Sequence, residues 1–82
     1  MTYVHVASVT THADGSTSER EYLAECPGHT GREAYRSRLA GLRAVGADVV
    51  TEKRGTDLVI VLTTRHNDCT TVERLTFDGS AS

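Results

Sequence analysis

The chain has 82 residues, of which 38% are hydrophobic and 24% are charged, and its formal net charge is -2. This length allows one domain at most, and a core of this size leaves little room for a substrate pocket. The negative net charge excludes a generally basic nucleic-acid-binding protein. No apolar stretch is long enough to cross a bilayer, and the first residues lack the basic segment of a secretory signal peptide, so we expect a cytoplasmic protein without membrane contact.

Two segments near the start of the chain are expected to pair as a hairpin. Residues 3–11 are rich in β-branched side chains and alternate along the run, with Val4 and Val6 on one face. An Asp-Gly turn signal follows at residues 14–15, and residues 17–25 alternate again.

A helix is expected over residues 31–45. Thr30 and Glu33 have the spacing of a capping box, in which the Thr30 hydroxyl accepts from the Glu33 amide and the Glu33 carboxylate accepts from the Thr30 amide. Gly46 supplies the left-handed residue that commonly follows the end of a helix.

Three further strands are expected at residues 48–53, 57–65 and 70–77. The nearly unbroken apolar run 58–62 indicates the best-buried strand, which we place at the centre of the sheet. The side chains expected to pack between this strand and the helix are Leu58, Ile60, Leu62, Leu39 and Leu42.

These elements follow one another in the order β-β-α-β-β-β. Every connection except the one through the helix is short enough for a hairpin, which favours antiparallel pairing. The sequence therefore predicts an α+β fold, a mostly antiparallel sheet of about five strands with one helix on one face. We expect a single compact domain over residues 1–78 and a disordered C-terminal tail at residues 79–82.

Each of the two cysteines has a histidine three residues away, as Cys26 with His29 and His66 with Cys69. Residues at this spacing flank a two-residue turn, so their side chains can converge on one ion. Locally the pattern resembles a zinc-ribbon knuckle, although threonine stands where the knuckle glycine would follow each pair. It predicts a structural zinc site formed by Cys26, His29, His66 and Cys69.

Other interpretations of these residues stay open. Each cysteine can be an ordinary core residue beside a turn, and a Cys26–Cys69 disulfide would close a long loop, although a cytoplasmic location disfavours it. Cys26, ahead of the helix, could also act as a nucleophile, but no third orienting group is recognisable. His5 and His12 have no partner in the pattern and are expected on a strand surface.

The helix carries four of the nine basic residues. Arg32, Arg36 and Arg43 share a narrow sector on one flank, and we predict that they bind a partner, because a guanidinium pairs bidentately with carboxylate or phosphate. A merely solvated flank is the alternative. Arg38 faces the sheet and either extends past its edge or pairs with an acid. The remaining flank is made of small residues and predicts a homodimer contact through Ser37, Ala40, Gly41 and Ala44.

Phosphate-loop, dinucleotide-binding, nucleophile-elbow and metalloprotease motifs are all missing from the sequence, so we do not expect an enzyme. We expect a small binding protein, an inhibitor or accessory factor, that docks on a protein partner. The alternatives are a zinc-stabilised module that binds nucleic acid through the helix arginines and a small Cys/His enzyme. Lys53 is the only lysine beside eight arginines, a usage typical of GC-rich genomes such as those of actinobacteria and their phages.

Overall fold

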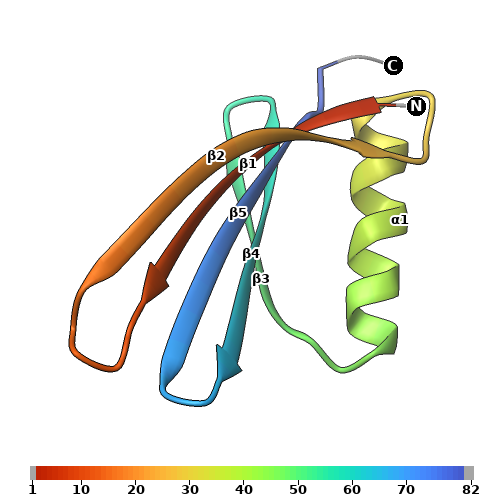
Figure 1. Cartoon of the computed structure of the whole chain (residues 1–82). Helices are drawn as coiled ribbons and strands as arrows, with labels where there is room; N and C mark the ends of the chain where they lie inside the picture. The colour runs from red at the N-terminus through yellow and green to blue at the C-terminus, as the bar shows by residue number, and fades with distance from the viewer. Residues whose placement is uncertain (1, 81–82) are drawn as a thin grey trace.

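A five-stranded sheet carries one helix on one of its faces in the computed structural model, which describes residues 2–80 (Figure 1). All four strand pairings are antiparallel. The elements are β1 Thr2–Thr11, β2 Thr17–Cys26, α1 Gly31–Ala44, β3 Asp48–Arg54, β4 Asp57–His66 and β5 Cys69–Asp78. The predicted α+β fold with the order β-β-α-β-β-β is therefore confirmed.

The strands lie in the order β2-β1-β5-β4-β3. The segment predicted to be the central strand, β4, is interior but lies next to the edge strand β3, and the middle position belongs to β5. The reason is that β5 pairs with β4 on one side and with β1 on the other, which joins the N-terminal hairpin to the rest of the sheet. Helix α1 connects the two edge strands, β2 and β3.

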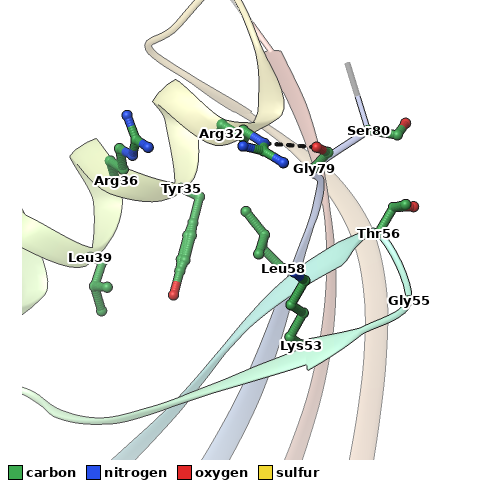
Figure 2. A pocket seen from close by; sticks show the side chains of 10 residues that line it. All are labelled: Arg32, Tyr35, Arg36, Leu39, Lys53, Gly55, Thr56, Leu58, Gly79 and Ser80. Carbon is green, nitrogen blue, oxygen red and sulfur yellow. Dashed lines mark hydrogen bonds between the residues drawn. The ribbon is translucent and has the colours of Figure 1, made fainter. Parts of the chain in front are cut away.

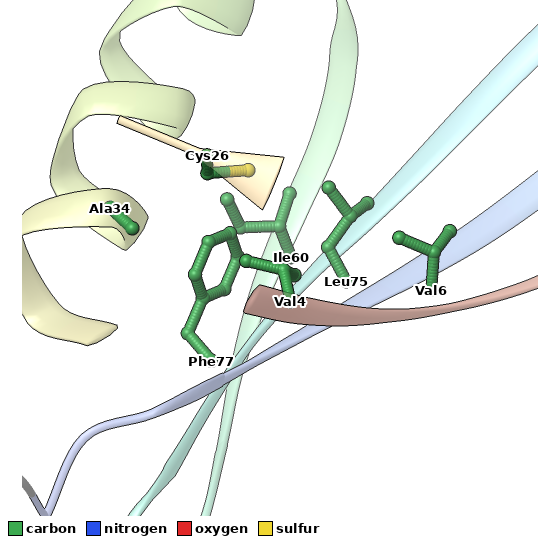
Figure 3. Close-up of a cluster of buried hydrophobic side chains, with 7 residues drawn as sticks. All are labelled: Val4, Val6, Cys26, Ala34, Ile60, Leu75 and Phe77. Atoms are coloured by element: carbon green, nitrogen blue, oxygen red, sulfur yellow. The ribbon is translucent and has the colours of Figure 1, made fainter. Parts of the chain in front are cut away.

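The core lies between the helix and the half of the sheet that is nearest the N-terminal end of the helix (Figure 3). Its buried members are Val4, Val6, Cys26, Ala34, Ile60, Leu75 and Phe77. The predicted contact layer is present, since Leu39 and Leu42 of the helix and Leu58 and Leu62 of β4 pack against this cluster. The ring of Tyr35 stacks on Phe77 with 5.7 Å between centroids. Toward the hairpin turns at residues 12–16 and 67–68 the strands diverge from the helix (Figure 1).

The helix begins at the predicted cap, with one difference from the predicted hydrogen bonds. The Glu33 amide donates to the Thr30 hydroxyl at 3.2 Å, as expected. The Glu33 carboxylate accepts at 2.9 Å from the amide of His29 instead of the amide of Thr30. The carboxylate therefore reaches one residue further back than in a capping box, and it still satisfies a free amide near the helix N-terminus.

Gly31 places the first turn of the helix directly on the backbone of β5. A Cβ atom at this position would overlap the carbonyl oxygen of Asp78, the last residue of β5. Only glycine permits this close approach. Gly41, in the same helix, has nothing within 4 Å of the position that its Cβ would take. The helix is thus in direct contact with the sheet backbone at its beginning but not at Gly41.

The segment 79–82, for which the sequence predicts disorder, is described for Gly79 and Ser80; Ala81 and Ser82 lie outside the described residues. Gly79 is buried, its amide donates to the Thr56 carbonyl at 2.9 Å, and its carbonyl accepts from Arg32 Nε at 2.9 Å. The Ser80 hydroxyl and amide both donate to the Asp78 carboxylate, and these bonds lower the pKa of Asp78. Gly79 is therefore fixed between the helix and the β3–β4 turn.

Within residues 2–80, no helix has the length and apolar character needed to span a membrane.

Two glycine substitutions in the same helix should have opposite effects on stability. Gly31→Ala should lower the free energy of unfolding by about 1–3 kcal/mol, because the added methyl group meets the Asp78 carbonyl. Gly41→Ala should raise it by up to about 1 kcal/mol through helix propensity alone. Urea unfolding measures both, and equal stabilisation by the two substitutions would show that the helix is not seated on β5.

Shortening a core side chain should lower the free energy of unfolding far more than shortening a side chain on the edge strand. Ile60 is fully buried, so Ile60→Ala should lower the free energy of unfolding by about 2–5 kcal/mol. Val50 on β3 is 59% exposed, and Val50→Ala should change stability by no more than about 0.5 kcal/mol. Thermal and urea unfolding compare the two variants; similar losses would contradict the assigned core.

Candidate functional site

The two predicted Cys/His pairs lie at opposite ends of the sheet. Cys26 ends β2 and pairs with Thr2 at the start of β1, whereas Thr70, next to Cys69, pairs with Thr11 at the end of β1. Because a strand rises about 3.3 Å per residue, the two pairs are separated by about 30 Å. Cys26 and Cys69 are free thiols, and this distance excludes a disulfide between them within one chain.

The structure therefore does not bring together the four residues predicted to bind zinc, Cys26, His29, His66 and Cys69. In the described part of the chain, no three His, Cys, Asp or Glu side chains are grouped closely enough to hold a metal ion. The i, i+3 spacing correctly marks two sites of chain reversal, but the strand register places one beside the helix start and the other at the β4–β5 turn. Local spacing carries no information on that separation.

Cys69 instead contacts a histidine that the sequence pattern left without a partner. Its Sγ lies 3.9 Å from Nδ1 of His12, and Nε2 of the same ring lies 2.8 Å from the Ser18 hydroxyl. These residues join the turn ends of the β1–β2 and β4–β5 hairpins. His12, expected on a strand surface, is half-buried. Cys26 is 3% exposed and belongs to the core, as one of the open interpretations held.

The two thiols should differ sharply in their reaction with iodoacetamide. Cys69 is half-buried at a hairpin end and should be alkylated in the folded protein, whereas the core residue Cys26 should react only after unfolding. Mass spectrometry of tryptic peptides after timed alkylation measures the two rates. Alkylation of both thiols at the same rate under native conditions would contradict their assigned positions.

A groove of about 650 Å³ lies between α1 and the β3–β4 hairpin (Figure 2). Helix α1 contributes one wall, the hairpin the other, and the residues after β5 close one end. The residues that line the groove are Arg32, Tyr35, Arg36, Leu39, Lys53, Gly55, Thr56, Leu58, Gly79 and Ser80. Because Arg32 in the first turn of α1 and the residues Gly79 and Ser80 line it, the groove is at the end of the molecule where the helix begins and the described chain ends.

Local structure explains why these side chains meet. Arg32 and Arg36 are one helical turn apart, so they lie on the same flank of α1. Lys53 pairs with Leu58 across the hairpin, and both side chains are on the helix side of the sheet. The hairpin turns tightly through Gly55, whose φ of 60° favours glycine.

The groove carries three positive charges over an apolar floor. Its cations are Arg32, Arg36 and Lys53, and no carboxylate within residues 2–80 forms a salt bridge with any of them. The salt bridges in that part of the chain involve Arg54, Arg65 and Arg74. The Arg32 bond to the Gly79 carbonyl orients the guanidinium without neutralising it. Tyr35, Leu39 and Leu58 supply the apolar surface between the cations.

Two of the three predicted partner-binding arginines, Arg32 and Arg36, thus line the groove, and Arg43, exposed in the last helical turn, does not. Arg38 is exposed on the other side of the helix and lines a cavity of about 320 Å³ beside β2. No salt bridge of Arg38 occurs among the described residues. The four small residues predicted at a homodimer contact, Ser37, Ala40, Gly41 and Ala44, are all exposed, and that contact stays a prediction.

Comparison with known proteins found no family, curated protein or solved structure that matches this chain.

Proposed function

We propose that this protein is a small binding protein that docks on a protein partner by accepting an acidic segment in the groove between α1 and the β3–β4 hairpin. The observation that carries the proposal is the set of three cations without a carboxylate partner in the described chain, arranged around an apolar floor. Arginine forks bind carboxylates bidentately, and apolar contacts between the charges add affinity that salt does not screen.

A protein segment fits this surface better than a nucleic acid does. The groove has one aromatic ring, Tyr35, and one face of that ring is already stacked on Phe77, so the groove lacks the row of free aromatic faces on which successive bases stack. The edge strand β2 exposes Glu19, Glu21 and Glu25, which would repel a long phosphate backbone. The molecule is thus basic at the groove and acidic along β2, a distribution that suits a compact partner.

The lining residues also favour recognition over catalysis. None of the ten is a histidine, cysteine, aspartate or glutamate, the side chains that most often transfer protons or attack substrates at neutral pH. Arginine, lysine, tyrosine and aliphatic side chains instead provide charge, hydrogen-bond donors and contact area. Tyrosine and arginine are among the residues enriched in binding interfaces.

Selection from a random linear peptide library on the folded protein tests this proposal. The enriched peptides should be richer in aspartate and glutamate than the starting library, and Arg36→Ala should weaken a selected peptide about tenfold, the loss expected for one charged hydrogen bond. Arg43→Ala removes the same charge outside the groove and should change the affinity less than about twofold.

Fluorescence titrations with single-stranded and duplex DNA at low salt complete the test. Weak binding that Arg36→Ala leaves unchanged agrees with the proposal. Binding that falls steeply with salt, and that Arg32→Ala and Arg36→Ala each flatten by about one counterion, would favour the nucleic-acid function instead. Enrichment of peptides without acidic residues would also contradict the proposal.

A further inference from the structure

We propose that the acidic segment binds as an extended strand that pairs antiparallel with β3 and becomes the sixth strand of the sheet. Its acidic side chains, at alternate positions, then face Arg32 and Arg36. This inference rests on the proposed function and specifies the conformation and the sequence pattern of the partner. Its basis is the position of the groove directly beside an edge strand.

Strand β3 presents an open row of backbone groups. It is at the edge of the sheet and, within residues 2–80, pairs only with β4. The hairpin closes through a two-residue turn flanked by the pair Arg54 and Asp57, whose backbone groups bond to each other in such hairpins. By alternation along the strand, Val49, Thr51 and Lys53 direct their amides and carbonyls outward. An extended peptide can pair with such a row.

Charge distinguishes this edge from the other one. The arginine flank of α1 lies across the groove from β3, whereas the opposite edge strand, β2, exposes three glutamates. The acids of β3 itself are neutralised, because Asp48 pairs with Arg65, and Glu52 pairs with Arg54 and Arg74. An acidic strand is therefore attracted to the β3 edge and repelled from the β2 edge.

The spacing of the arginines matches that of alternate residues in a strand. Arg32 and Arg36 are four residues apart on a helix, which corresponds to about 6 Å along its axis. Side chains at alternate positions of a strand are about 6.6–6.8 Å apart. Acidic residues at positions i and i+2 of an added strand can therefore each face one arginine. Lys53, on the same side of β3, adds a third positive charge.

The intervening residues of the added strand face the other side of the sheet. There, β3 exposes Val50, whose side chain is 59% accessible. In an antiparallel sheet, residues side by side on one face contact each other, so apolar residues at these positions would cover Val50. The structure thus predicts a segment in which acidic and aliphatic residues alternate.

The experiment compares synthetic peptides on the full ¹⁵N-labelled chain. A peptide of alternating glutamate and valine should bind, and it should slow hydrogen exchange of the Val49, Thr51 and Lys53 amides at least about tenfold by pairing with them. A peptide of the same composition, with all glutamates before all valines, should bind at least about tenfold more weakly. Such a peptide cannot place glutamates on the arginine side and valines on the Val50 side along the same stretch of strand.

Backbone N-methylation tests the strand directly. In antiparallel pairing the glutamate amides face β3, so N-methylation at the glutamates should abolish protection of the three amides, and N-methylation at the valines should leave binding within about twofold. The reverse pattern, protection confined to β2, or equal binding of the block peptide would overturn strand addition.

The Arg36→Ala variant, combined with hydrogen exchange, distinguishes failure of the inference from failure of the proposed function. If Arg36→Ala still weakens peptides that protect no β3 amide, the acidic groove stands and the added strand is wrong. If no acidic peptide depends on Arg36, the proposed function itself fails, and strand addition fails with it.

Discussion

The close contact between Gly31 and the end of β5 is the constraint on which the rest of the arrangement depends. A helix that touches the sheet backbone has little freedom to roll, because its first turn is held at backbone distance. The hydrogen bonds that Gly79 makes to Thr56 and Arg32 connect the same end of the helix to the β3–β4 turn. Which flank of the helix borders β3, and hence which arginines line the groove, follows from this seating.

Local sequence patterns predicted the elements well, because alternation, caps and turn residues act over a few positions. The Thr30 cap and the Asp-Gly turn are cases in which side-chain chemistry decides the backbone nearby. The order of strands depends on pairing between distant segments. The apolar run of β4 therefore indicates a buried strand, but it does not show that the middle position belongs to β5. The four residues predicted to bind zinc lie at opposite ends of the sheet for the same reason, since spacing marks turns but not which turns meet.

Part of the candidate site can be predicted from the sequence. A helical projection is sufficient to place Arg32 and Arg36 together, because the helix period is fixed. The sequence does not indicate that Lys53 and Leu58 belong to the same site, because their position beside the arginines depends on how the helix crosses the sheet. The contact between Cys69 and His12 joins residues 57 positions apart and has no local signal.

The divergence of the strands from the helix divides the molecule, 44 Å long, into two ends of different character. The groove belongs to the end where the buried side chains and the fixed glycines are found, so its walls are already ordered before a ligand arrives and little conformational entropy remains to be lost. At the other end, turn residues 13–16 and 67–68 are exposed and carry no part of the groove. They are therefore the positions where insertions, labels or fused domains can be accommodated without altering recognition.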